Sequence, residues 1–111
     1  MLTMYSTKAG ELRSLNTKTM QRTLSVILMG SVYVAKHCAV VMSKKNRALE
    51  EKGLILFVSS TLSMDGDKGT LAYSASKGAI NGLVMPMARD LGRYGIRVAA
   101  IAPSLSDTPF I

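Results

Sequence analysis

Two continuous apolar segments, separated by a helical one, most strongly constrain the fold of this chain. Residues 54–59 read LILFVS and residues 96–102 read IRVAAIA, and turn-forming residues bound both runs. Between them, residues 72–93 have the composition of a long helix, which is expected to stop at Gly95. A strand, a helix and a strand of these lengths predict a parallel pair with a right-handed crossover. Uninterrupted apolar strands are typical of sheets covered on both faces, so the chain is predicted to be an α/β protein.

A second long helix is predicted over residues 19–45. Its apolar residues cover nearly the whole circumference for several turns, which indicates burial on most sides, by its own domain and by a partner subunit. Thr17 or Thr19 is the expected N-cap. Residues 1–17 are polar and weakly patterned and are expected to form a loop or the frayed approach to this helix. The stretch 61–71 contains two glycines and two aspartates and is expected to form another loop.

The length and composition describe one small, apolar unit. The chain has 111 residues, of which 48% are hydrophobic and 19% are charged, and this balance argues against disorder. Residues 1–111 are predicted to form a single partial domain, with 1–18 as a poorly defined N-terminal segment. Lys36 and His37 interrupt the longest apolar stretch, residues 24–42, so no membrane span is expected.

The net charge of +7 raises the question of a nucleic-acid partner. The basic residues are dispersed except at 43–47, where cations at a helix end oppose the negative end of the helix dipole. No aromatic platform or recognition motif accompanies the charge, so no nucleic acid is expected to bind. Cys38 is the only cysteine and His37 the only histidine. The sequence therefore predicts neither an internal disulfide nor a metal site.

A serine, a tyrosine and a lysine are candidates for chemistry. Tyr73 and Lys77 are four residues apart at the start of the predicted helix and share a face. Ser60 ends the preceding strand, on the edge where parallel sheets bind ligands. A hydroxyl can polarise a carbonyl, a phenol can exchange a proton, and an ammonium can stabilise a phenolate. At a separation of about 4 Å that stabilisation is ~1 kcal/mol in bulk water and ~4 kcal/mol at an effective dielectric of about 20, so it requires partial exclusion of water.

A tyrosine and lysine at this spacing are common on helix surfaces, but the combination with Ser60 is specific. It resembles the signature of the short-chain dehydrogenase/reductase family, in which Tyr-x-x-x-Lys opens a helix and a serine precedes it. The resemblance runs from about residue 20 to 111. It implies the middle-to-C-terminal part of a Rossmann-like, doubly wound parallel sheet. The implied reaction is hydride transfer between NAD or NADP and a secondary alcohol or ketone.

The resemblance also implies roles for individual residues. Tyr73 would be the acid/base, Ser60 would orient the substrate oxygen, and Lys77 would hold the nicotinamide ribose beside Tyr73. Pro103 and Ser104 are similar to the family's Pro-Gly turn after the next strand. In the segment DTPF, Thr108 resembles the threonine that contacts the nicotinamide carboxamide.

The similarity narrows further within the family. Residues 73–103 are most similar to members that act on 3-hydroxyacyl-CoA and hydroxysteroids and that are mitochondrial, tetrameric and NAD-dependent. This implies NAD rather than NADP, and an alcohol, ketone or acyl-CoA as substrate. It also implies a homo-oligomer formed through helices 19–45 and 72–93. The sequence leaves the compartment open between mitochondrion and cytoplasm.

Three features depart from the family. No glycine-rich phosphate loop precedes the first helix, so this chain by itself is expected to be inactive and unable to bind a dinucleotide. Ser104 replaces the turn glycine. Ile27 stands where the family has an asparagine, which holds a water through its backbone carbonyl and side chain. The alternative hypothesis is a non-catalytic fragment or interaction module that associates through its two long helices.

Overall fold

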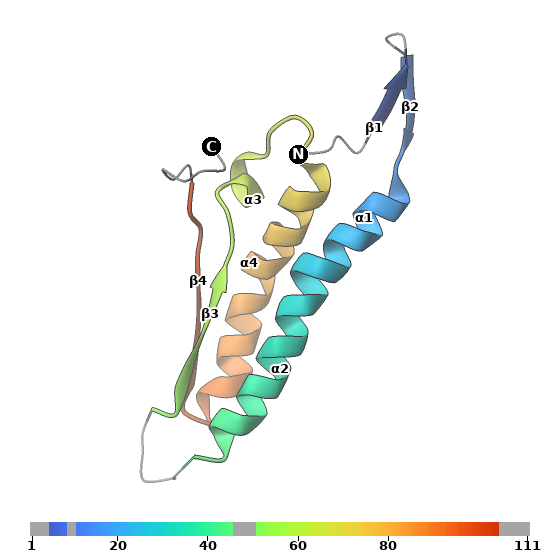
Figure 1. Cartoon of the computed structure of the whole chain (residues 1–111). Coiled ribbons are helices and arrows are strands. Elements are labelled where there is room, and N and C mark those ends of the chain that lie inside the picture. The colour runs from blue at the N-terminus through green and yellow to red at the C-terminus, as the bar shows by residue number, and fades with distance from the viewer. Residues whose placement is uncertain (1–4, 9–10, 46–50, 105–111) are drawn as a thin grey trace, which may run out of the picture.

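A long helical arm lies beside a small α/β unit in the computed structural model of the chain, which describes residues 5–8, 11–45 and 51–104 (Figure 1). The molecule is elongated, with extents of 65 × 30 × 22 Å. Its elements in chain order are β1 (Tyr5–Lys8), β2 (Glu11–Leu15), α1 (Thr17–Thr23), the π-helical segment η1 (Leu24–Met29), α2 (Gly30–Ser43), β3 (Gly53–Val58), α3 (Leu62–Asp65), α4 (Leu71–Gly92) and β4 (Ile96–Ile101).

The strand–helix–strand prediction is confirmed. β3 and β4 pair in parallel, with a register that runs from Gly53 opposite Ile96 to Val58 opposite Ile101. The predicted bounds are within one residue of those observed. After α4, Gly95 has a φ of 74°, a left-handed conformation that lets the chain turn sharply into β4.

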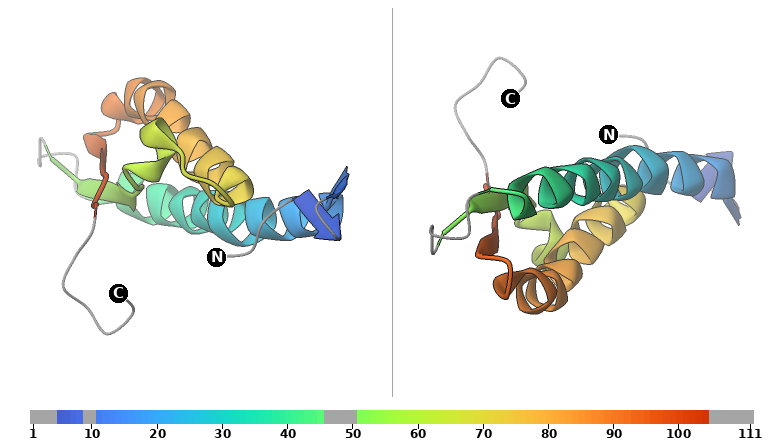
Figure 2. Two further views of the ribbon diagram at one scale, coloured as in Figure 1. Left: turned by 90° about the horizontal axis from the view of Figure 1, so that it is seen from above. Right: turned by 90° about the horizontal axis from the view of Figure 1, so that it is seen from below.

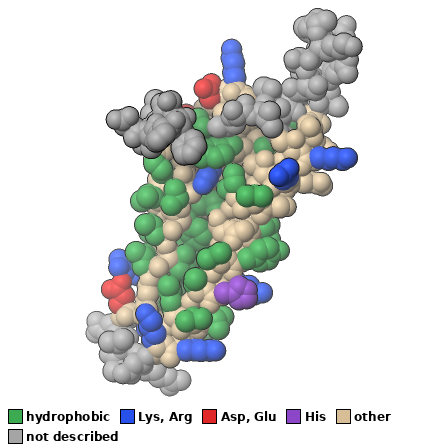
Figure 3. All heavy atoms as spheres, in the orientation of Figure 1, with side chains coloured by type: hydrophobic (Ala, Val, Ile, Leu, Met, Phe, Trp, Pro, Cys, Tyr) green, Lys and Arg blue, Asp and Glu red, His purple; other side chains and the backbone are tan. Residues whose placement is uncertain are grey.

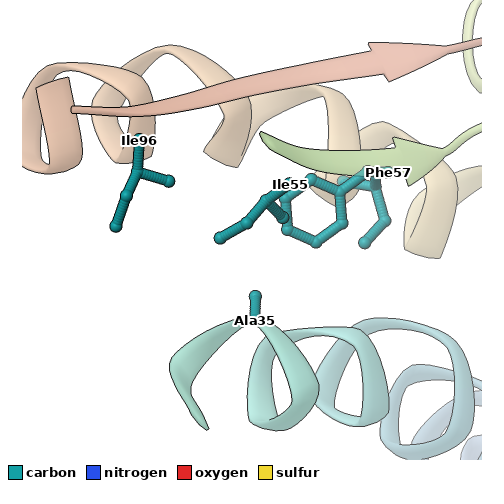
Figure 4. Packing of buried hydrophobic residues seen from close by; sticks show 5 residues of the cluster. Ala35, Ile55, Phe57 and Ile96 are labelled. Atoms are coloured by element: carbon teal, nitrogen blue, oxygen red, sulfur yellow. The ribbon is translucent and has the colours of Figure 1, made fainter. Parts of the chain in front are cut away.

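The hydrophobic core lies on one face of this sheet. Ile55 and Phe57 from β3 and Ile96 from β4 point towards the helices, where Ala35 of α2 and Ile80 of α4 meet them (Figure 4). These five side chains are buried. α4 packs mainly against β4, whereas α2 lies nearer to β3.

The opposite face of the sheet is uncovered, which corrects the prediction of strands buried on both faces. Leu54, Leu56 and Val58 alternate along β3 with the buried residues and are exposed. Ile101 on β4 is exposed as well. Within the described part of the chain, no helix packs over these side chains.

The long N-terminal helix is continuous from Thr17 to Ser43 and contains η1 in its middle. It begins two residues before the predicted position. Asn16, and not Thr17 or Thr19, is its N-cap: the Asn16 side chain accepts a hydrogen bond of 3.2 Å from the Thr19 N–H. The expectation of burial on most sides is wrong within this chain, because the described residues of this helix include only one buried side chain, that of Ala35.

Two segments predicted to be loops contain regular structure. β1 and β2 form an antiparallel hairpin with an irregular register. They escaped prediction because so short a pair has little hydrophobic alternation. α3 is a single turn inside the predicted loop 61–71. Figure 2 shows the hairpin at the far end of the long helix, away from the sheet.

By length and apolar composition alone, the helix Thr17–Ser43 could cross a membrane, with a mean hydropathy of 1.7. Core helices of soluble proteins and signal sequences share these properties, so the finding does not establish a membrane span. The expectation that this helix does not span a membrane stays a prediction.

Candidate functional site

The candidate site begins where β3 and β4 end. Beyond the sheet, the Ser59 N–H donates to the Ile101 carbonyl at 2.7 Å and the Thr61 N–H donates to the Pro103 carbonyl at 3.2 Å. The segments that leave the two strands therefore stay side by side. Ser60 lies between the two donors, at the edge where the sequence placed it.

Ser60 is buried, and its hydroxyl oxygen accepts a hydrogen bond of 3.2 Å from the Leu62 N–H. This contact supports the first turn of α3. A serine hydroxyl that accepts one hydrogen bond still has its own hydrogen to donate. Ser60 therefore keeps the donor that a substrate oxygen would need.

Tyr73 and Lys77 lie on the first two turns of α4, and both are half-buried. The Lys77 ammonium nitrogen is 5.7 Å from the centroid of the Tyr73 ring, within the range of a cation–π contact. The spacing of the two residues thus brings them together, as predicted. Among the described residues, no hydrogen bond joins Tyr73 to Ser60.

Lys77 also ties α4 to the end of β3. Its ammonium donates to the Val58 carbonyl at 2.7 Å, and the buried Ser59 hydroxyl donates to the Lys77 carbonyl at 3.2 Å. We call this reciprocal pair of bonds, made by Val58, Ser59 and Lys77, the strand–helix clasp. The clasp holds α4, which carries Tyr73 and Lys77, in position relative to Ser60.

The sequence did not single out several polar residues that support the site. Ser59 is one of them, and its only signal was its place beside Ser60 at a strand end. The Asn81 side-chain amide donates to the Ser63 hydroxyl at 2.6 Å, which holds α3 against α4. The fully buried Ser76 donates to the Ala72 carbonyl at 2.7 Å inside α4. These pairings depend on tertiary neighbours or on burial, which spacing along the chain does not reveal.

The departure at Ile27 has a local structural context. Ile27 lies in η1, where the helix is locally π-helical, and its carbonyl accepts a hydrogen bond of 2.7 Å from the Ser31 hydroxyl. The Ser31 hydroxyl thus bonds to the same backbone carbonyl that, by the resemblance, would hold a water.

The structure describes two of the three remaining predicted cofactor-binding residues. Pro103 and Ser104 follow β4 and are exposed at the same edge as Ser60. Thr108 lies outside the described residues. In the ranges that the structure covers, no group of three or more His, Cys, Asp or Glu side chains could hold a metal ion.

Comparisons with known proteins place this chain in a family. A family model described as short chain dehydrogenase matches residues 3–111. The human 3-hydroxyacyl-CoA dehydrogenase type-2 is 40% identical over 108 residues, which are 96% of this chain and 41% of the relative. The Drosophila melanogaster protein of that name is 37% identical over 92 residues, 82% of this chain and 36% of the relative. This chain therefore spans about two-fifths of the length of these relatives.

Solved structures agree. A 3-hydroxyacyl-CoA dehydrogenase type-2 from Mycobacterium avium superimposes with a TM-score of 0.82 at 31% identity, over 93% of this chain and 40% of that one. An NAD+-bound xylitol dehydrogenase superimposes with a TM-score of 0.77 at 31% identity, over 87% of this chain and 35% of that one. The predicted α/β, Rossmann-like fold is confirmed by these neighbours. On the sequence match and the shared fold together, the chain belongs to the short chain dehydrogenase family.

Proposed function

We propose that this chain supplies the proton-transfer end of the active site in a nicotinamide-dependent oxidoreductase acting on a secondary alcohol or ketone. Family membership supports the reaction class. One observation carries the assignment to this site: the Lys77 ammonium lies 5.7 Å from the Tyr73 ring, at the sheet edge that also holds Ser60.

Each of these residues has a distinct role in the proposed reaction. A bound nicotinamide would accept or return the hydride. Tyr73 takes the proton of the substrate hydroxyl during oxidation and gives it back during reduction. Ser60 donates its free hydroxyl hydrogen to the substrate oxygen. The Lys77 ammonium has three donors, and the Val58 carbonyl takes one, so the others can stabilise the phenolate and bind a ribose hydroxyl.

The residues present fit the nicotinamide end of such a cofactor. Lys77 has spare donors, and the exposed Pro103 and Ser104 border the same edge, with Thr108 further along the chain. The pyrophosphate end would need a glycine-rich turn between a strand and a helix. None of the described strand–helix connections has that composition. We favour NAD over NADP, since one structural neighbour is an NAD+-bound xylitol dehydrogenase and another is a 7α-hydroxysteroid dehydrogenase in complex with NADH.

For the substrate we propose a 3-hydroxyacyl-CoA. The human relative at 40% identity has that activity in its name. A hydroxysteroid is the alternative, because a 7α-hydroxysteroid dehydrogenase superimposes with a TM-score of 0.69 at 28% identity. Both are secondary alcohols, so Tyr73 and Ser60 would act on either in the same way.

The test is a chimaera in which this chain replaces the matched part of the human relative. Tyr73→Phe should lower turnover of a 3-hydroxyacyl-CoA by 10²–10⁴-fold, roughly the contribution of general acid–base catalysis, while NADH binding persists. Tyr94→Phe is the matched control, because Tyr94 lies beyond the far end of α4. If Tyr73→Phe retains more than about a tenth of the rate, Tyr73 is not the acid/base.

The chain by itself is proposed to be inactive. It should not bind NADH measurably in a calorimetric titration, because a pyrophosphate is held by backbone amides at a glycine-rich helix terminus and none of the described helices begins with such a turn. Binding with a micromolar dissociation constant would contradict this proposal without affecting the role of Tyr73.

The second candidate function is association between copies through the two long helices. Val26, Tyr33 and Val40 lie on the long helix and Met85 on α4, and all four are more than half exposed. Large apolar side chains that gather on a protein surface mark association sites, and these four are exposed on the two helices that the sequence assigned to the interface. Tyr33→Lys should shift the sedimentation profile towards monomer, whereas Met64→Lys should not, although Met64 on α3 is more exposed, at 81% against 56% for Tyr33. A wild-type chain that sediments as a monomer at all concentrations would exclude this function.

A further inference from the structure

Asn81 lies one helical turn beyond Lys77 on α4, and the proposed proton transfer does not use it. Tyr73, Lys77 and Asn81 follow one another at intervals of four residues, so they lie along one face of the helix. The Asn81 side-chain amide donates to the Ser63 hydroxyl at 2.6 Å, and both residues are half-buried. The helix face that carries the proposed acid/base therefore also holds α3.

The segment 58–63, which leaves β3, is attached to α4 on both sides of Ser60. Before Ser60, the strand–helix clasp makes two hydrogen bonds to the helix. After it, Asn81 bonds to Ser63. A methyl group added at Gly78 would lie 3.9 Å from the Ser63 carbonyl oxygen, so the segment runs close along the helix there.

The chain beyond Ser63 has little packing to hold it. Residues 64–68 are exposed, and Figure 3 shows charged side chains projecting into solvent at the end of the molecule where α3 lies. The next buried residue is Thr70, just before α4. Among the described side-chain hydrogen bonds, that of Asn81 is thus the one that joins α3 to α4.

The position of α3 is passed on to Ser60. The Ser63 N–H donates to the Ser60 carbonyl at 3.0 Å, and the Leu62 N–H donates to the Ser60 hydroxyl oxygen at 3.2 Å. A displacement of Ser63 therefore moves the Ser60 hydroxyl. A shift of about 1 Å in a reacting geometry can lower a rate by about 10²-fold.

We propose that Asn81 is a positioning residue for the reaction. Through Ser63 and α3, it holds the Ser60 hydroxyl where Ser60 and Tyr73 both reach one substrate oxygen. Asn81 itself does not contact the substrate. The inference rests on the proposed function, because it assumes that Ser60 orients the substrate.

The test is a double-mutant cycle in the chimaera described above. Ser60→Ala should lower turnover about 10²-fold, as expected for the loss of one oxyanion donor. Asn81→Leu, which is close to isosteric, should lower turnover about tenfold when Ser60 is present. In the Ser60→Ala background it should cause no further loss, because no hydroxyl is left to position. Ser63→Ala breaks the same bond from α3 and should give the same pattern.

Thr70→Val is the matched control. It removes a buried hydroxyl at the other end of the connection between Ser60 and α4, where Thr70 donates to the Asp67 carbonyl at 2.7 Å. Its effect on turnover should be the same factor with and without the Ser60 hydroxyl.

Hydrogen exchange of the full chain gives a readout that does not depend on turnover. In Asn81→Leu, the Leu62 amide should exchange about fivefold faster, the change expected for the loss of one hydrogen bond. The amides in the last turns of α4 should exchange as in the wild type.

Three results would overturn the inference. An equal loss of turnover from Asn81→Leu in both backgrounds would mean that Asn81 acts on stability alone. Unchanged exchange at Leu62 would mean that α3 does not need Asn81. Wild-type turnover in Ser60→Ala would remove the role of Ser60, and with it this inference, while the role of Tyr73 is tested separately by Tyr73→Phe.

Discussion

The two faces of β3 differ sharply, although the residues on them are chemically alike. Ile55 and Phe57 are 8% and 6% exposed, whereas Leu56 and Val58, beside them in sequence, are 49% and 53% exposed. The helices α2 and α4 cover the first pair, and no described element covers the second. An uninterrupted apolar strand is typical of a sheet that is covered on both faces, and the described part of this chain covers only one of them.

The largest expected effect sharpens this contrast. Phe57→Ala should lower the free energy of unfolding by about 3–5 kcal/mol, because it opens a cavity in the core. Leu56→Ala, on the open face, should cost less than about 1 kcal/mol. Urea unfolding of both variants measures the difference. Equal losses would mean that the open face is covered in solution.

A second variant tests how the covered face is built. Gly95, with φ of 74°, turns the chain from α4 into β4. Gly95→Ala should cost about 1–2 kcal/mol, the penalty for a side chain in the left-handed region. Gly92→Ala is the control, since an added methyl group would meet nothing within 4 Å. If the thermal melt of Gly95→Ala matches that of the wild type, residue 95 does not have a positive φ in solution.

Removing one bond of the strand–helix clasp should lower the free energy of unfolding by a smaller amount. Ser59→Ala removes the hydroxyl that donates to the Lys77 carbonyl, and a hydrogen bond of this kind contributes about 1 kcal/mol. Ser43→Ala, whose hydroxyl bonds, among the described residues, to the Val40 carbonyl of its own helix, should be nearly neutral. Chemical denaturation compares the two. A loss no greater in Ser59→Ala than in Ser43→Ala would show that the clasp does not stabilise the fold.

The smallest expected effect lies on the open face. Arg97 is paired across from Leu54 and donates to the Glu51 carboxylate at 2.6 Å. Both side chains are more than half exposed, so Arg97→Ala should change stability by less than about 1 kcal/mol. The change should shrink in 1 M salt, where charges are screened. A larger loss that persists in high salt would indicate that Arg97 is buried by a partner.

Local signals in the sequence were sufficient for much of the fold and for part of the site. The apolar runs, the glycine at 95 and the length of the connection predicted β3, α4 and β4 in parallel. The spacing of Tyr73 and Lys77 predicted their shared face. The N-cap was misassigned, because three neighbouring polar residues can all cap a helix and only the backbone geometry selects Asn16.

The sequence by itself determined the two long helices, the parallel strands β3 and β4 and the side chains that share a face on them, because periodicity is a local property of the chain; it did not determine β1, β2 and α3. Only the tertiary structure decided which face is covered. It also decided that the Lys77 ammonium bonds to the Val58 carbonyl and that Ser59 secures the helix. These contacts join residues about twenty positions apart, and their geometry follows from how α4 packs on the sheet. Packing of that kind depends on the whole set of neighbours, which no single stretch of sequence contains.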